Sequence, residues 1–159
     1  MAKWMDSNLQ TQGYCLSEQQ SKALRVGLRF STALCLALVV TGLALQSAVL
    51  ILALVPIGAL AGWSPRHPFD LIWNHGLRHL SDEPPLPPNP QRRRHAFKLA
   101  TVWLLAVGVL FAVGASTVAL ALGVVLVAVC GTITATNLCL PSEFLAGWER
   151  LRGGKPAAS

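Results

Sequence analysis

The stretch FSTALCLALVVTGLALQSAVLILALVPIGALAGWSP, residues 30–65, decides the fold because it holds no charged side chain. A second uncharged stretch covers residues 99–142. All 13 Lys and Arg residues and all 7 Asp and Glu residues lie outside both, in residues 1–29, 66–98 and 143–155. One helix needs about 20 apolar residues to cross a bilayer, so each stretch is too long for one crossing and suits two. The sequence therefore predicts an all-α membrane protein built from two helical hairpins, with every charge on one side.

The composition agrees with this prediction. Hydrophobic residues make up 53% of the 159 residues and charged residues only 13%, whereas a soluble domain carries about 25% charged residues. The positive-inside rule makes the charged side the cytoplasm, so both termini are expected there. The first residues lack the apolar core and cleavage site of a signal peptide, and we expect the first helix to be an uncleaved anchor.

The chain has a net charge of +6, and many of its basic side chains lie where the helices are expected to enter the membrane. There they meet anionic headgroups, each with roughly 1 kcal/mol of attraction, and Trp rings favour the same depth. The bilayer is therefore the expected partner, and nucleic acid is not. The residues expected at the headgroups are Arg25, Arg29, Trp73, Arg92, Arg93, Arg94, Lys98 and Trp148.

Local signals set the helix boundaries. Ser17 and Gln20 fit a capping box that begins the first helix, Gln46–Ser47 makes a tight turn, and Pro56 is expected to kink the second helix. Four transmembrane helices and two short helices at the cytoplasmic interface result. The six predicted helices cover residues 18–45, 48–63, 69–80, 96–113, 118–138 and 143–152.

The first interfacial helix is predicted from helical period. We expect its apolar face to meet the membrane. That face holds Phe69, Ile72, Trp73, Gly76 and Leu80, and the opposite face holds Asp70, Asn74 and Arg78.

The two hairpins are predicted to be a tandem repeat. They align without gaps at an offset of 73 residues, which pairs Pro68 with Pro141 and Asp70 with Glu143. Two crossings per unit leave both units in one orientation, the parallel kind of repeat. The alternative is that any two hairpins with cytoplasmic ends look alike. The predicted segments are an N-terminal segment 1–17, a first unit 18–80, a Pro-rich and basic linker 81–95, a second unit 96–152 and a disordered tail 153–159.

The two uncharged stretches contain no ionisable Asp, Glu, Lys, Arg or His. Ion paths and proton relays need such groups, so an ion-coupled transporter or pump is disfavoured, and no cofactor is predicted. Polar residues near the end of the fourth helix favour hydrogen bonds within or between helices. A polar substrate path is the alternative. These residues are Thr132, Thr134, Thr136 and Asn137.

The four cysteines divide by place. Cys35 and Cys130 are expected inside the membrane as small apolar residues. Cys15 and Cys139 are expected on the reducing cytoplasmic side, where a structural disulfide is disfavoured. Cys139 is the candidate reactive thiol, because nearby Arg and Lys favour a thiolate. Simple packing is the alternative role for Cys139.

His75 and His79 stand four residues apart, so they share a helix face and are weak candidates for a metal site. A third ligand would come from His67, His95 or an acid. The alternative is a solvated pair. The sequence holds no phosphate loop, dinucleotide fingerprint or nucleophile triad.

Residues His67–His79 (HPFDLIWNHGLRH), the proline linker, the basic run into Phe97 and Asn137–Ser142 (NLCLPS) together resemble the bacterial membrane family DUF4395. The resemblance covers roughly residues 25–150. It implies the bacterial inner membrane but no activity. Some members are similar to neighbours of thioredoxin-like and sulfur-transfer proteins, and several carry a Cys-x-x-Cys near Cys139. Here Ser142 takes the place of the second Cys.

Three functions fit the sequence. The leading hypothesis is a non-catalytic accessory or scaffold subunit, with other membrane subunits or further copies of this chain as partners. The first alternative is a thiol-dependent protein that passes sulfur or electrons through Cys139. The second alternative is a small-solute or lipid-handling pore lined by the Thr-rich face of the fourth helix.

Overall fold

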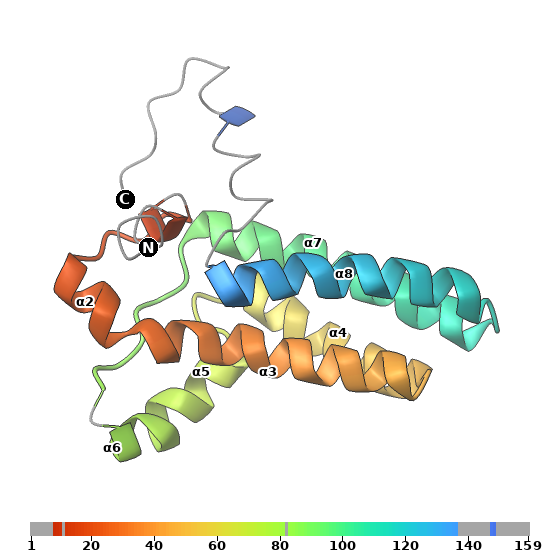
Figure 1. Ribbon diagram of the computed structural model, residues 1–159, viewed down its shortest axis with the longest axis horizontal. Coiled ribbons are helices and arrows are strands. Elements are labelled where there is room, and N and C mark those ends of the chain that lie inside the picture. The colour runs from red at the N-terminus through yellow and green to blue at the C-terminus, as the bar shows by residue number, and fades with distance from the viewer. Residues whose placement is uncertain (1–7, 11, 82, 137–146, 149–159) are drawn as a thin grey trace.

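The computed structural model describes residues 8–10, 12–81, 83–136 and 147–148. All of its regular elements in these ranges are helices, which confirms the all-α prediction (Figure 1). They are α2 (Glu18–Ala23), α3 (Arg25–Ala44), α4 (Ala48–Trp63), α5 (Pro68–Ile72), the π-helix η1 (Trp73–Leu77), α6 (Arg78–Ser81), α7 (Gln91–Ala112) and α8 (Ser116–Thr136).

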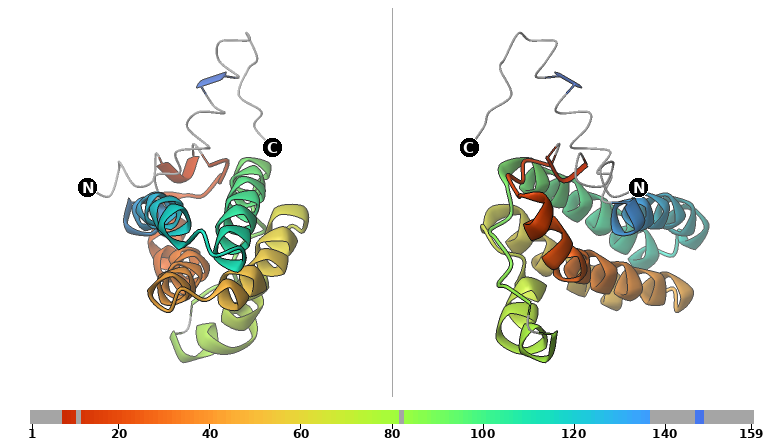
Figure 2. Two further views of the ribbon diagram at one scale, coloured as in Figure 1. Left: turned by 90° about the vertical axis from the view of Figure 1, so that its right-hand side faces the viewer. Right: turned by 60° about the vertical axis from the view of Figure 1, so that its left-hand side comes forward.

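The long helices α3, α4, α7 and α8 pack as a bundle, which the left view of Figure 2 shows end-on. Helix α4 lies against α3 and α7, and α8 lies against the same two helices from the other side. Both tight turns, α3–α4 and α7–α8, lie at one end of the bundle (Figure 1). The core is apolar and draws on all four helices. Its most enclosed side chains are Ile51, Val107 and Ala119, each 0% exposed.

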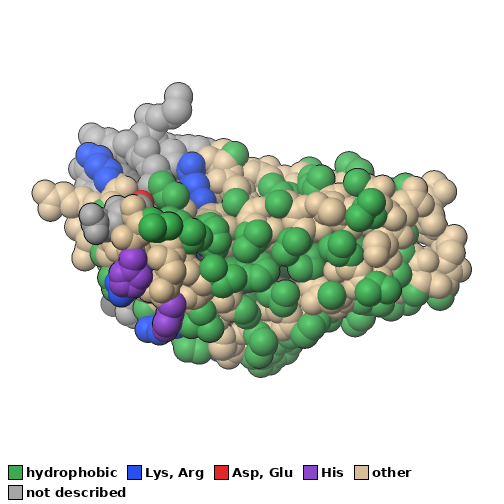
Figure 3. Space-filling model, turned by 90° about the horizontal axis from the view of Figure 1, so that it is seen from below, with side chains coloured by type: hydrophobic (Ala, Val, Ile, Leu, Met, Phe, Trp, Pro, Cys, Tyr) green, Lys and Arg blue, Asp and Glu red, His purple; other side chains and the backbone are tan. Residues whose placement is uncertain are grey.

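Within the described residues, three helices are long and apolar enough to cross a membrane: Val26–Ala44, Gln91–Ala112 and Ser116–Thr136. A fourth crossing exists if Ala48–Trp63 and Pro68–Leu80, which bend by 82° at their break, form one span. Figure 3 shows basic and His side chains gathered at one end, while the remaining face is apolar and uncharged. The tandem repeat stays a prediction, since Pro141 and Glu143 lie outside the described residues.

The predicted helix start at Ser17 and the turn at Gln46–Ser47 are confirmed, whereas the first helix is divided and the kink at Pro56 stays a prediction. Ser17 and Gln20 form the expected capping box, and Ser47 caps α4 by accepting the Leu50 N–H. The first helix divides at Leu24 into α2 and α3, and α4 continues through Pro56. The turn before α8 uses Gly114 at φ 80°, a left-handed conformation that suits a residue without Cβ.

Glycines bring α4 and α7 close together. A Cβ placed on Gly58 would lie 2.6 Å from Thr101 Oγ1, and one on Gly62 would lie 2.7 Å from Lys98 Cγ. The two glycines are four residues apart and so share one face of α4. Small residues at this spacing let helix backbones approach where the lipid supplies no hydrophobic force.

Residues 69–80 separate Asp70 and Asn74 from Ile72 and Leu80 as predicted, but both polar side chains are buried in the protein, and so is Trp73 of the predicted apolar face. Asp70 and Asn74 are buried, whereas Ile72 and Leu80 are 50% and 85% exposed. The physical reason is that both buried polar side chains have partners in the protein: Asn74 Oδ1 accepts the Leu86 N–H at 2.8 Å. A helical period cannot show such partners. The segment therefore turns Asp70, Asn74 and Trp73 inward, and Ile72 and Leu80 outward.

Candidate functional site

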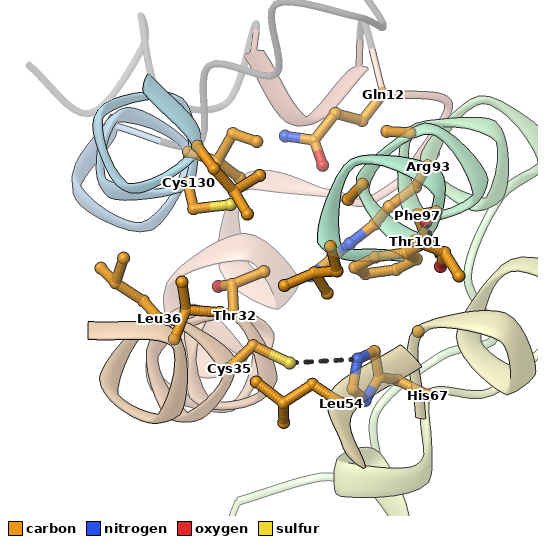
Figure 4. Close-up of a pocket in the computed structure, with 17 residues that line it drawn as sticks. Gln12, Thr32, Cys35, Leu36, Leu54, His67, Arg93, Phe97, Thr101 and Cys130 are labelled. Carbon is orange, nitrogen blue, oxygen red and sulfur yellow. Dashed lines mark hydrogen bonds between the residues drawn. The ribbon is translucent and has the colours of Figure 1, made fainter. Parts of the chain in front are cut away.

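A cavity of about 90 Å³ lies inside the bundle (Figure 4). Side chains of α3, α4, α7 and α8 form its wall, which is almost entirely apolar. Polar or sulfur-bearing groups reach it at a few points only. These are Gln12, Thr32, Cys35, His67, Arg93, Thr101 and Cys130.

His67 lies in the connection between α4 and α5 and is only 1% exposed. It is the N-cap residue of α5: its Nδ1 accepts the Phe69 N–H at 3.1 Å. A neutral imidazole that accepts at Nδ1 carries its proton on Nε2. The ring contacts Phe69 and Phe97, with centroids 5.2 and 5.1 Å away.

The imidazole of His67 is neutral at pH 7. Burial lowers its pKa to about 4, and this effect outweighs the carboxylate of Asp70, which raises the pKa; Arg93 lowers it further. Both the pKa and the acceptor role of Nδ1 therefore agree on one state, with an N–H at Nε2. That N–H points at Cys35, whose Sγ lies 3.7 Å away (Figure 4).

Asp70 holds α5 against the bundle. Its carboxylate accepts hydrogen bonds from the hydroxyl of Ser31 on α3, from the His67 backbone N–H at 3.0 Å and from Asn89 Nδ2 at 3.1 Å. A buried carboxylate needs such donors because its desolvation is costly. This network fixes the backbone of His67 and hence the position of its ring.

The network continues to a buried cation. Asn89 Oδ1 accepts the hydroxyl hydrogen of Tyr14 at 2.8 Å, and Arg93 Nη1 donates to the Tyr14 oxygen at 2.7 Å. Arg93 Nη2 donates to the Leu28 carbonyl at 3.0 Å. Burial is the largest effect on Tyr14 and raises its pKa, so the phenol stays neutral. Asn89 and Tyr14 thus link the charges of Asp70 and Arg93.

The residues that were expected at the lipid headgroups differ in how deeply they are buried and in what they contact. Arg93 and Trp73 are 7% and 5% exposed, so both lie inside the protein. Three others bind helix ends: Arg29 donates to the Ala135 carbonyl, Arg94 donates to the Trp63 carbonyl, and Lys98 Nζ lies 5.1 Å from the Trp63 ring centre. Arg92 is half-buried and Trp148 is 49% exposed. The side chain of Arg25 lies outside the described part.

The structure places the candidate metal pair, His75 and His79, but does not describe the candidate thiol Cys139. His75 and His79 are exposed, and within the described ranges no three His, Cys, Asp or Glu side chains are placed to share a metal ion. Cys15 is exposed. Cys139 and Asn137 lie outside the described residues.

The threonine hydroxyls of α8 form hydrogen bonds within their own helix, which is the first of the two roles expected for them. Thr132, Thr134 and Thr136 each donate to the carbonyl four residues earlier, at 2.8, 2.8 and 2.6 Å. None of the three lines the cavity, whose α8 wall is formed by Leu126, Cys130 and Ile133.

Sequence reasoning missed the contact between Cys35 and His67, which are 32 residues apart. It treated Cys35 as packing and His67 as a spare metal ligand. One signal was available: in His67–Pro68–Phe69–Asp70 the proline opens a helix, the acid stands at its third position, and an imidazole precedes both. This order indicates a capping histidine with a fixed ring.

The fold and site define an all-helical protein with apolar helices suited to a membrane and a thiol beside a buried, neutral imidazole. The family described as "Domain of unknown function (DUF4395)" matches residues 25–150, and the chain belongs to it. No curated protein and no solved structure matches the chain.

Proposed function

We propose that this chain is a thiol-dependent membrane protein whose reactive group is Cys35. The observation that carries the proposal is the contact between Cys35 Sγ and His67 Nε2 at the wall of the cavity. The proposed reactive thiol is therefore Cys35, which lies within the bundle, and not Cys139.

His67 serves as a hydrogen-bond donor in this site. Its Nδ1 is occupied by the Phe69 N–H, so Nε2 carries the proton and cannot remove one from Cys35. A donated N–H stabilises the negative charge that sulfur acquires when the thiol loses its proton before attack. The site therefore differs from a protease dyad, in which the imidazole is the base.

The cavity limits which reactants reach the thiol. Its volume of about 90 Å³ is smaller than the roughly 150 Å³ cavity that holds one benzene molecule. Its wall is apolar, and an apolar wall gives no compensation for the desolvation of a charge. We therefore propose small, neutral, electrophilic reactants.

Two reagents of matched chemistry test the proposal. Methyl methanethiosulfonate is neutral and leaves only a small methylthio group on the thiol, whereas its trimethylammonium-ethyl analogue leaves a larger group that carries a cation. In a variant with Cys15→Ser, Cys130→Ser and Cys139→Ser, we expect the neutral reagent to modify Cys35 in the folded protein and the cationic reagent to leave it free. His67→Asn should slow the reaction, because it removes the N–H donor and keeps an acceptor for Phe69. Mass spectrometry of intact protein follows both reactions.

Matched substitutions on α7 locate the reaction in the cavity. Ala100 lines the cavity, whereas Ala106 is exposed on the same helix. Ala100→Phe should block the neutral reagent and Ala106→Phe should not. The proposal fails if Cys35 stays unmodified in the folded protein but reacts after denaturation, or if the two Phe variants behave alike.

We propose the accessory-subunit role as a second candidate. It is supported by the outward apolar side chains of α5, η1 and α6, of which Leu71, Ile72 and Leu80 are 46%, 50% and 85% exposed. A gentle-detergent pull-down from native membranes with mass spectrometry of intact complexes tests it. A stoichiometric larger complex supports the role, and a lone monomer or homo-oligomer contradicts it.

A further inference from the structure

Cys130 lies on α8, across the cavity from Cys35 on α3 (Figure 4). The sequence gives no reason to join them, because they are far apart in the chain and share no motif. Neither the thiol proposal above nor the family description assigns Cys130 a role.

Contacts along α3 and α8 fix the register of these two antiparallel helices. Arg29 on α3 donates to the carbonyl of Ala135 on α8. Further along, Leu43 lies against Gly123, where an added Cβ would meet the Leu43 side chain. Counting inward from these two contacts brings Cys35 level with Cys130. The two thiols therefore stand at one height on neighbouring helices, and both open on the same cavity.

A disulfide between these positions is geometrically accessible. Packed helices have axes about 8–10 Å apart and radii of about 2.3 Å to Cα. Directly facing Cα atoms are then roughly 3–5 Å apart, and the upper part of this range overlaps with the Cα separations that disulfides span. Cys35 Sγ now points at His67, so it must first rotate about χ1 to another staggered position.

We propose that Cys130 is the resolving thiol of Cys35, and that the pair is oxidised to a disulfide by a small neutral peroxide. This inference rests on the proposed function, since it requires Cys35 to react first. The volume of the cavity admits an oxidant of this size. Hydrogen peroxide is near the size of two waters, about 60 Å³ on the liquid scale, and fits the space of about 90 Å³.

The chemistry proceeds in two balanced steps. Cys35 Sγ attacks one peroxide oxygen, the O–O bond breaks, and one water leaves with the thiol proton; Cys35 becomes a sulfenic acid. Cys130 Sγ then attacks Cys35 Sγ, the S–O bond breaks, an S–S bond forms, and the Cys130 proton leaves in a second water. Two thiols lose two electrons in total, and one peroxide gains them.

The test uses full-length protein in detergent, with Cys15→Ser and Cys139→Ser so that only the pair remains. After hydrogen peroxide treatment, we expect intact monomer that has lost two hydrogen atoms and a peptide linking Cys35 to Cys130. The matched control adds Cys130→Ser and Val129→Cys, which moves the thiol by one residue around α8. In this control we expect no link and a sulfinic acid at Cys35.

The outcomes separate the two proposals. If Cys35 of the pair protein goes to the sulfinic acid without a link, Cys130 is not its resolving thiol and this inference falls, while Cys35 keeps its reactive role. If peroxide leaves both thiols unchanged although the neutral thiosulfonate modifies Cys35, the peroxide assignment falls. If neither reagent reacts with folded protein, the proposed function falls too. A link in the control equal to that in the pair protein would also overturn the inference.

Discussion

Replacement of Asp70 by Ala is expected to be among the most destabilising single changes at this end of the bundle. The carboxylate accepts three hydrogen bonds, from the Ser31 hydroxyl, the His67 N–H and Asn89 Nδ2. Asp70 is 6% exposed, and Ser31 and Asn89 are 1% and 7% exposed. Each buried donor left without a partner costs about 1–3 kcal/mol. Because Ser31 can rotate its hydroxyl toward another acceptor, we expect a total of about 3–5 kcal/mol.

Asp70→Asn separates hydrogen bonding from charge. Its carbonyl oxygen can still accept from His67 and Asn89, and its amide can donate to the Ser31 oxygen. What remains is the loss of the negative charge that balances Arg93, for which we expect about 1–2 kcal/mol. The ratio of the two losses therefore reports how much of the effect is hydrogen bonding.

Thermal unfolding in a mild detergent, followed by tryptophan fluorescence, measures both losses. For a chain of this length 1 kcal/mol corresponds to about 2–4 °C in Tm, so Asp70→Ala should lower Tm by about 6–20 °C and Asp70→Asn by about 2–8 °C. His79→Ala, an exposed change on α6, is the control and should lie within about 0.5 kcal/mol of wild type. Equal Tm values for Asp70→Ala and the control would refute the reasoning.

Three further predictions follow from the same packing. The pKa of His67 is about 4 in the folded protein against an ordinary 6.5, so the unfolded chain binds more protons between these two pH values. The free energy of unfolding should therefore fall by up to about 3 kcal/mol as the pH drops from 6.5 toward 4. Tm measured against pH should show this fall in the wild type and not in His67→Asn, and parallel curves for the two proteins would contradict the prediction. Gly58→Leu should cost about 1–3 kcal/mol by forcing α4 from Thr101, while Gly131→Leu on α8, where an added Cβ meets nothing within 4 Å, should be near neutral; equal Tm values would show that α4 and α7 are not held by close approach. Tyr14→Phe should cost about 1–2 kcal/mol, since it removes the hydroxyl between Asn89 and Arg93, and should speed proteolysis within residues 8–17; an unchanged cleavage rate would contradict it.

The helices were predictable because their signals are local. Two uncharged stretches located the four long helices, Ser17 and Gln20 located a helix start, and Gln46–Ser47 located a turn. Each signal depends on composition or on residues within one turn of each other. Helix α7 shows the limit of these signals: it begins at Gln91 and not near Ala96. The charged residues of its first turn do not look like part of an apolar helix, so the sequence pattern assigned them to the linker.

The site was not predictable because its contacts are distant in sequence. Helical period placed Asp70 opposite the apolar face but gave no sign of its burial, because its partners Ser31 and Asn89 are 39 and 19 residues away. Arg93 belongs to a basic run that suggests headgroups, yet it reaches Tyr14 and Leu28 across 79 and 65 residues. An uncharged helix gave no hint that Cys35 faces an imidazole. Tertiary partners decide burial at all three positions.

The single imidazole of His67 has two separate duties, one on each ring nitrogen. Nδ1 starts helix α5, and Nε2 faces the thiol of Cys35. Amide side chains can imitate the two nitrogens one at a time: Asn places an oxygen near the first, and Gln places an N–H near the second. An exchange between Asn and Gln at this one position would therefore transfer the defect from the reactivity of the cysteine to the architecture of the end of the bundle where α5 begins.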